Sequence, residues 1–233
     1  MNKIQILYEN HVKSSHFMPG WGFAALITIG DKKVLFDTGA DVLVLRNNAS
    51  AFQVDFDEID ALVLSHHHCD HIGAVSPIRH ANLDVHCTTS LPLDVQNGIT
   101  KDGGTVHVAA SAEQVIPGVM TTGEMGNEIT EQALVLDVPS GPILITGCAH
   151  PGIDNMASVA TSLLGRPLDL VLGGFHLLRE SDEHVQAIAS RFKDLRIRRI
   201  APCHCTGSHA TELLKEAYGK HSLDICAGAE LLF

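Results

Sequence analysis

Ser65-His66-His67-His68-Cys69-Asp70-His71 places four histidines and one aspartate in a single short stretch. It directly follows Ala61–Leu64, a continuous apolar run typical of a strand buried on both faces. Residues two apart at an extended strand end project to the same side, so His66 and His68 can bind one cation. Imidazole is a good ligand for zinc or iron, and the stretch therefore predicts a metal site.

Asp70 and His71 lie on the expected turn into the next helix, displaced enough to face a second cation. Paired metal sites hold their ions roughly 3.5–4 Å apart. The alternative is a solvated polar loop or a mimic of a purification tag, which fits poorly because the run is internal and includes a suitably spaced aspartate. Alternation points His67 and Cys69 the other way, and we expect them to pack or to support the ligands.

Composition limits the classes of function. The chain has 233 residues, 45% of them apolar, which predicts one compact domain over residues 1–233. The net charge of −11 disfavours nucleic acid as a partner, and a small-molecule substrate is expected instead. No apolar run is long enough for a membrane helix, and the start lacks a secretory layout, so we expect no membrane association and a cytoplasmic location. The six cysteines form no CxxC pair and are expected to be free thiols; the oligomeric state is left open.

The pattern of elements changes along the chain. The first half is rich in strands and opens with an antiparallel meander whose hairpin turns at Gly30-Asp31. The second half alternates helices and strands. We expect the α/β class, with two sheets packed face to face and helices outside, a four-layer α/β/β/α sandwich. The expected strands are Lys3–Tyr8, Phe23–Ile29, Lys33–Phe36, Ala61–Leu64, Leu83–Thr88, Thr105–Ala109, Val119–Thr122, Ala133–Val138, Ile143–Thr146, Leu168–Leu172, Arg198–Ala201 and Leu223–Ile225, and the expected helices are Asp41–Arg46, Asp154–Leu164, Asp182–Leu195 and Ala210–Tyr218.

Further motifs resemble the metallo-β-lactamase superfamily. Besides the histidine stretch, these are Leu35–Gly39, Ile145–Cys148 and Ala201–Gly207. The resemblance implies that Asp37 supports the metal loop and that His204 binds the second ion. It also implies a bridging aspartate after the strand that ends near residue 146, where this chain has Cys148.

A narrower likeness is to the branch of dihydropterin ribofuranosyl-aminobenzene phosphate synthase-like hydrolases. It is carried by Trp21–Phe23, Thr146–Ile153, Gly173–Leu177 and His204–Gly207. One fold in this superfamily serves many reactions, so the likeness leaves the substrate open.

The chain departs from the superfamily pattern at two positions. The usual third histidine would fall near Val115–Thr122, which has no imidazole, and we expect His150 to replace it. A Cys148 thiolate can bridge two borderline ions, whereas a protonated thiol would leave a looser or single-metal centre. We expect Cys203 and Cys205 to point away from His204 and to pack or to support the ligands, rather than to bind metal themselves.

His176 follows Gly173-Gly174, a pair that permits close backbone approach at a strand end. It can bind substrate, shuttle a proton or bind metal, and the alternative is an ordinary buried histidine.

These residues predict a metal-dependent hydrolase that uses a metal-bound hydroxide on an ester, thioester or phosphoester. Asp70 would bind metal and orient the hydroxide, and His176 would be a reserve proton donor. The cofactor is expected to be two divalent ions, with zinc favoured and manganese or iron as alternatives. Two other functions stay open: a synthase-like transfer joining an aminobenzoate to a phosphoribosyl donor, and a non-catalytic metal sensor. The expected metal ligands are His66, His68, Asp70, His71, Cys148, His150 and His204.

Overall fold

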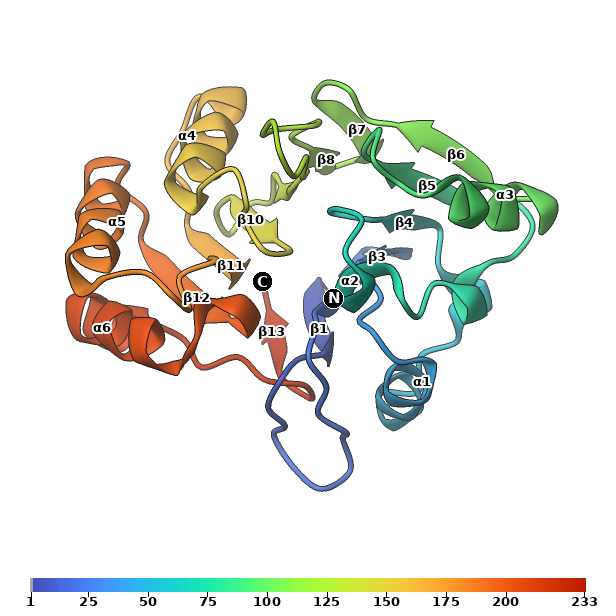
Figure 1. Cartoon of the computed structure of the whole chain (residues 1–233), viewed down its shortest axis with the longest axis horizontal. Helices are drawn as coiled ribbons and strands as arrows, with labels where there is room; N and C mark the ends of the chain where they lie inside the picture. The colour runs from blue at the N-terminus through green and yellow to red at the C-terminus, as the bar shows by residue number, and fades with distance from the viewer. Residues whose placement is uncertain (1) are drawn as a thin grey trace. The chain divides into compact units, whose positions relative to one another are not determined.

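The computed structural model describes residues 2–233, whose contacts divide into two compact units. The first contains the residues up to Ser111 together with Cys226–Phe233, and the second contains Ala112–Ile225. Each holds one mixed β-sheet with helices packed on it (Figure 1). The expected α/β class with two helix-flanked sheets is confirmed, while a single domain over residues 1–233 stays a prediction.

The first unit contains a seven-stranded sheet in the order β13-β1-β2-β3-β4-β5-β6. Strands β1 to β3 form the expected antiparallel meander, and β3 to β6 run parallel to one another. Gly30, with a φ of 63°, makes the hairpin turn, because a positive φ is readily adopted by glycine. The strands are β1 (Lys3–Tyr8), β2 (Ala24–Ile29), β3 (Lys32–Phe36), β4 (Ala61–Val63), β5 (Asp84–Cys87), β6 (Thr105–Val108) and β13 (Glu230–Leu232).

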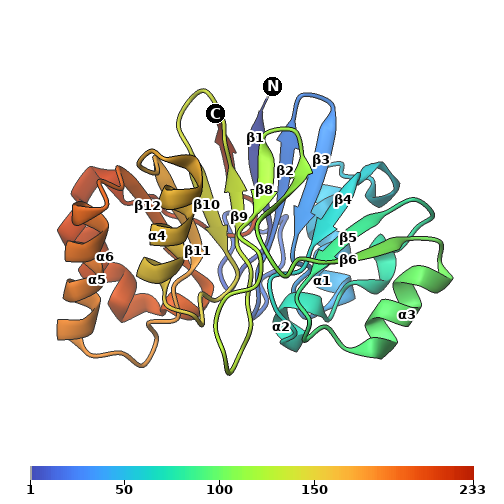
Figure 2. The same ribbon diagram turned by 90° about the horizontal axis from the view of Figure 1, so that it is seen from above.

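Helices α1 (Val42–Ala51), α2 (Cys69–Ile72) and α3 (Leu93–Lys101) lie on the same side of this sheet (Figure 2). The Asp41 side chain accepts a hydrogen bond from the Leu43 N–H and so caps the start of α1. Leu45 of α1 and Ile99 of α3 are buried in one core with alternate residues of the strands. Short 3₁₀ turns connect these elements at η1 (Phe56–Glu58) and η2 (Ser76–Ile78).

The second unit contains a six-stranded sheet in the order β12-β11-β10-β9-β8-β7. Strands β10, β11 and β12 are parallel, as the βα alternation of the sequence predicts, and β7 to β10 are successively antiparallel. The strands are β7 (Glu113–Ile116), β8 (Val119–Thr121), β9 (Leu134–Leu136), β10 (Ile143–Thr146), β11 (Leu170–Gly174) and β12 (Arg199–Cys203).

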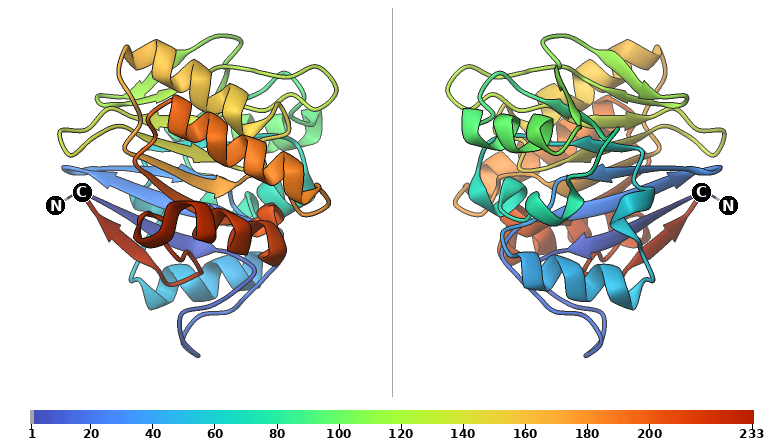
Figure 3. Two further views of the ribbon diagram at one scale, coloured as in Figure 1. Left: turned by 90° about the vertical axis from the view of Figure 1, so that its left-hand side faces the viewer. Right: turned by 90° about the vertical axis from the view of Figure 1, so that its right-hand side faces the viewer.

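Helices α4 (Ile153–Leu164), α5 (Asp182–Asp194) and α6 (Ser208–Tyr218) lie side by side across this sheet (Figure 3, left). Ser181 caps α5, whose first turn is acidic and last turn basic, as the helix dipole favours. Its apolar stripe is buried against the sheet, and the charged side chains lie on the opposite face. The 3₁₀ turns are η3 (His204–Thr206) and η4 (Gly219–His221).

Four elements differ from the sequence predictions. Leu223–Ile225 is not a strand: only Ser222 forms a bridge to Ile200, although the Leu223 N–H does bond to the Ile200 carbonyl. Helix α3 was not predicted, because it contains Gly98 and buries only Ile99, and β7 and β13 are short strands with weak alternation. Among residues 2–233, no helix is long and apolar enough to span a membrane.

The expected site residues follow the carboxyl ends of parallel strands in both sheets. In the first unit Asp37 follows β3, and the histidine stretch follows β4. In the second unit the segments after β10, β11 and β12 contain Cys148, His176 and His204. Ligands commonly bind at this edge in open α/β sheets, because loops from neighbouring parallel strands meet there.

Candidate metal centre

The first unit gathers four expected ligands and the supporting Asp37 in one group, which we term the loop cluster: Asp37, His66, His68, Asp70 and His71. It is organised by the Asp37 carboxylate, which is completely buried. Oδ1 accepts a hydrogen bond from the Ser65 N–H at 2.7 Å, and Oδ2 accepts one from the Ser65 hydroxyl at 2.7 Å. Oδ2 also lies 2.7 Å from Nδ1 of the buried His71 ring. Asp37 therefore supports the histidine loop, as the resemblance implies, while metal binding by this loop stays a prediction.

These contacts determine which nitrogen of the His66 and His71 rings has its lone pair free to bind a cation. The Ser65 hydroxyl has one proton and donates it to Asp37, so it accepts from His66 Nδ1 at 2.9 Å. The lone pair of a neutral His66 ring is then on Nε2. His71 likewise directs its Nδ1–H to the carboxylate and has its lone pair on Nε2. Fixing a tautomer through the far nitrogen is typical of metal-binding histidines.

Three further contacts bring the cluster together. His66 Nε2 lies 3.1 Å from His68 Nδ1, and the His66 and His71 ring centroids are 4.2 Å apart. Asp70, in the first turn of α2, places Oδ2 3.7 Å from His71 Nε2. Cys69 is exposed, in keeping with the expectation that it points away from His68.

The second unit gathers another group, which we term the turn cluster: Glu131, Cys148, His150, His204 and Cys205. Its organising carboxylate, Glu131, is completely buried. Oε1 accepts from the backbone N–H groups of Cys148 and Ala149, both at 2.8 Å. Oε2 accepts from the backbone N–H of His150 at 2.9 Å and lies 2.8 Å from its Nδ1. Glu131 could not be predicted from the sequence, because it belongs to no motif that sets it apart from the neighbouring acids Glu124 and Glu128.

Cys148, His204 and Cys205 are all buried, and their ligand atoms lie within 4.8 Å of one another. The expectation that Cys205 points away from His204 is therefore wrong. It assumed extended backbone, whereas residues 204–206 form a 3₁₀ turn, in which neighbouring side chains do not alternate between two sides.

His176 contacts His150, with the ring centroids 4.6 Å apart. Partial burial and the neighbouring His150 imidazole lower the pKa of His176 below its usual 6.5. Its backbone has a φ of 55°, in the left-handed region. Asp37, Ala149 and His204 share that conformation, which costs energy for non-glycine residues and commonly occurs at functional sites.

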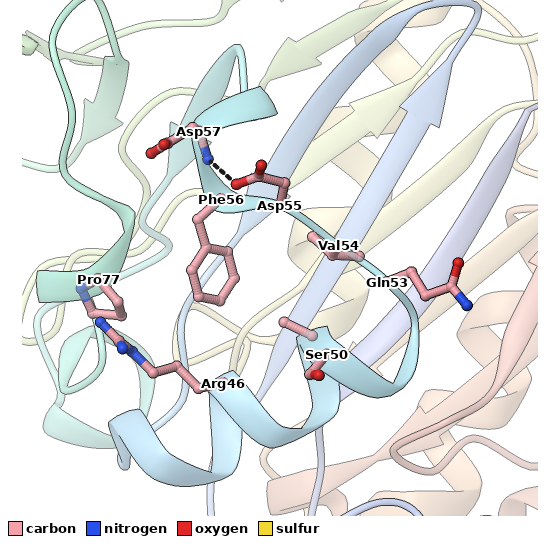
Figure 4. A pocket seen from close by; sticks show the side chains of 9 residues that line it. Arg46, Ser50, Gln53, Val54, Asp55, Phe56, Asp57 and Pro77 are labelled. Atoms are coloured by element: carbon pink, nitrogen blue, oxygen red, sulfur yellow. Dashed lines mark hydrogen bonds between the residues drawn. The ribbon is translucent and has the colours of Figure 1, made fainter.

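A separate surface pocket of the first unit has a volume of about 590 Å³ and contains none of the expected ligands (Figure 4). It is lined by α1, the loop that follows it and Pro77. Asp55, one of its acidic side chains, accepts the Asp57 N–H at 3.1 Å and so caps η1. The pocket therefore adds nothing to the two clusters.

Comparison with known proteins gives matches along the whole chain. Residues 19–109, which contain the complete loop cluster, match the Metallo-beta-lactamase superfamily. The 7,8-dihydropterin-6-methyl-4-(beta-D-ribofuranosyl)-aminobenzene-5'-phosphate synthase of Methanocaldococcus jannaschii is 25% identical, over 99% of this chain and 96% of that protein. The uncharacterized protein MJ0448 of the same organism is 29% identical, over 91% of this chain and 94% of that protein.

The fold also matches that of solved structures. Tm1679, described as a metal-dependent hydrolase of the beta-lactamase superfamily, superposes with a TM-score of 0.85 at 24% identity. The match covers 100% of this chain and 99% of that one. Together with the sequence match over residues 19–109 and the relatives, it confirms the resemblance of the motifs to the metallo-β-lactamase superfamily.

Proposed function

We propose that this protein is a metal-dependent hydrolase that binds a pair of divalent cations, with zinc favoured. The match of residues 19–109 to the metallo-β-lactamase superfamily, together with the shared fold, supports metal-dependent hydrolysis at the coarse level. The proposed substrate is a small molecule with an ester, thioester or phosphoester bond, and the proposed location is cytoplasmic. The proposed ligands are His66, His68, Asp70, His71, Cys148, His150 and His204.

The single observation that best supports metal binding is the His66–His68 pair. Its facing nitrogens lie 3.1 Å apart, and His66 presents a lone pair there. Two nitrogens bound to one tetrahedral zinc at about 2.0–2.1 Å lie roughly 3.3 Å apart. The donors therefore fit a shared cation with little rearrangement. The Asp37 and Glu131 carboxylates fit as well, because each binds the far nitrogen of an expected histidine ligand.

Bound divalent cations would supply Lewis acidity and bring the pKa of a coordinated water to about 7. Asp70 is proposed to orient the attacking water through a carboxylate oxygen. Because its pKa is lowered, His176 is mainly neutral at pH 7. A neutral ring can accept a proton or donate an N–H hydrogen bond to substrate, and these roles suit His176 better than releasing a proton from an imidazolium.

A second function is favoured by a specific relative. The Methanocaldococcus jannaschii protein is named as a synthase, and its match covers nearly all of both chains. A synthase-like transfer that joins an aminobenzoate to a phosphoribosyl donor is therefore our alternative proposal.

The test begins with protein loaded separately with zinc, iron and manganese. Metal content is measured by elemental analysis, and activity with chromogenic esters, thioesters and phosphodiesters. Product formation from aminobenzoate and phosphoribosyl pyrophosphate tests the alternative. Retained metal with neither activity would favour the sensor function, and a protein that retains none of the three metals would contradict all three functions.

Two neighbouring variants test the ligand assignment. His68→Ala is expected to remove metal and activity together, because it deletes a proposed ligand. His67→Ala is the matched control and is expected to retain most of the metal. Equal losses in both variants would refute the assigned directions of these side chains.

A further inference from the structure

We infer that Cys205 is itself a metal ligand and forms, with Cys148 and His204, a thiol-rich site for a borderline or soft cation such as zinc. This inference rests on the proposed metal-binding function and extends it. The superfamily resemblance implies a role for His204 alone in this turn, and sequence alternation assigned Cys205 to packing or to support of the ligands.

The first argument for this site is the spacing of its three donor atoms. The two sulfurs and the imidazole nitrogen lie within 4.8 Å of one another, and all three residues are buried. Two sulfurs bound to one tetrahedral zinc at about 2.3 Å lie roughly 3.8 Å apart, and a sulfur and a nitrogen roughly 3.6 Å. Shifts of about 1 Å, within the range of small side-chain rotations, would therefore bring the three atoms to ligand spacing.

The backbone explains how adjacent residues supply two of the donors. His204 has a φ of 51°, and η3 begins there. The Thr206 hydroxyl, which accepts from the Phe175 N–H at 3.0 Å, donates to the Cys203 carbonyl at 2.7 Å and holds the turn closed. Both His204 and Cys205 can therefore contribute to one site.

Gly174 makes room for the Cys205 sulfur. A methyl group at residue 174 would lie 2.6 Å from Cys205 Sγ and 3.3 Å from the Cys148 Cα. The sulfur thus occupies the space beside the turn that contains Cys148, where it donates to the Cys148 carbonyl at 3.5 Å. A side chain at residue 174 would clash with the Gly147 carbonyl oxygen as well as with the Cys205 sulfur.

The chemistry of the three donor atoms determines which metals the site should prefer. Two thiolates and one imidazole are softer than the carboxylate and imidazole donors of the loop cluster. Thiolates favour zinc, cobalt(II) or iron(II) over manganese, which prefers oxygen ligands. We therefore expect the turn cluster to reject manganese under conditions in which it retains zinc.

The experiment uses full-length protein in which cobalt(II) replaces the native cation, because thiolates bound to cobalt give a charge-transfer band in the near ultraviolet. Wild type is expected to show the band, and Cys205→Ser to lose about half of it, since one of two thiolate ligands is removed. Cys148→Ser should lose a similar share, and the double variant all of it. Cys203→Ser, a buried thiol two residues away, is the matched control and should retain the full band.

Wild-type protein gives a second measurement that does not depend on the folding of any variant. Zinc-edge X-ray absorption is expected to show two sulfur neighbours per chain, at about 2.3 Å from zinc. A full band in Cys205→Ser, or fewer than two sulfur neighbours, would overturn the role of Cys205. Metal bound only by nitrogen and oxygen would overturn this inference and leave the proposed hydrolase intact, whereas wild type that retains no cation would contradict the proposed function itself.

Discussion

The loop cluster and the turn cluster use the same kind of support but differ in how the chain builds them. In the loop cluster, His66, His68, Asp70 and His71 come from one continuous stretch, with Asp37 beneath them. In the turn cluster, donors from the segments after β10 and β12 are combined with Glu131 from the segment before β9. In each, a buried carboxylate accepts hydrogen bonds from backbone and imidazole N–H groups.

This difference shows that a carboxylate that positions metal ligands need not be close to them in sequence. Glu131 receives three backbone N–H groups and the Nδ1–H of His150, so it determines the shape of the turn as well as the orientation of one ligand. Asp37 receives one backbone N–H, one hydroxyl and the Nδ1–H of His71. If the comparison is correct, removing Glu131 should lower the stability of the fold more than changing Asp37 does. Changing Asp37 should mainly lower the metal affinity.

The largest effect is expected from Glu131→Ala. It leaves two buried and two partly buried donors without their acceptor. Each unsatisfied buried group costs about 1–3 kcal/mol, so we expect a loss of roughly 4 kcal/mol in the free energy of unfolding. Urea denaturation monitored by circular dichroism measures it. Glu128→Ala, at an exposed acid on the same segment, is the control and should change stability little. Similar stability of both variants would remove Glu131 from its organising role.

Metal removal is expected to have the next largest effect. A cation present at a thousand times its dissociation constant stabilises the folded state by about 4 kcal/mol, and a chelator should abolish that stabilisation. Amide hydrogen exchange at residues 65–71 and 147–151 should then accelerate in both clusters. Acceleration confined to one of them would show that only that cluster depends on a bound cation.

A smaller effect is expected from Asp37→Asn. The amide keeps the shape of the side chain but removes the charge that holds the Nδ1–H of His71. Changes to such supporting groups typically lower metal affinity by about 10–100-fold. Competition with a chromogenic chelator measures the affinity, with Asp31→Asn in the β2–β3 turn as the control. An unchanged affinity in Asp37→Asn would mean that the loop cluster does not depend on its carboxylate.

The smallest effect concerns α6 of the second unit, outside both clusters. Burial raises the pKa of Tyr218 to about 12. In the unfolded chain this phenol ionises near pH 10, so its contribution to stability is complete below pH 10 and is lost as the pH rises towards 12. Tyr218→Phe should flatten this part of the stability profile, between pH 10 and 12, in urea titrations. An unchanged profile in Tyr218→Phe would place the alkaline sensitivity elsewhere, the thiols of the turn cluster included.

Sequence patterns predicted the fold well where local signals and burial agree. The β1–β3 meander, the β9–β10 hairpin and helices α4 and α5 lie close to their predicted bounds, because alternation, turn residues and apolar stripes all point the same way there. The predictions were wrong for elements that have few pairing contacts or that pair with a strand far away in the sequence. Leu223–Ile225 has strand-forming residues but too little pairing beside β12, and β13 forms only by pairing with β1 from the other end of the chain.

The candidate site divides in the same way. His66, His68, Asp70 and His71 could be chosen from spacing alone, because residues so close along the chain cannot lie far apart in space. The positions of Glu131 and Cys205 could not be predicted from spacing. The first comes from a segment with no motif, and the second depends on the left-handed backbone of His204 and on the open space at Gly174.

The sequence by itself indicated the α/β class through hydrophobic periodicity and a candidate metal site through the ligand spacing of the histidine stretch, and its motifs carried the resemblance to the superfamily. The tertiary structure alone decided that Glu131 supports the turn with Cys148 and His150, and that Cys205 lies beside Cys148 and His204. The physical reason is that both arrangements join segments far apart in the chain. Their contacts depend on the register of β10, β11 and β12 and on the turns that follow these strands, which no local pattern specifies.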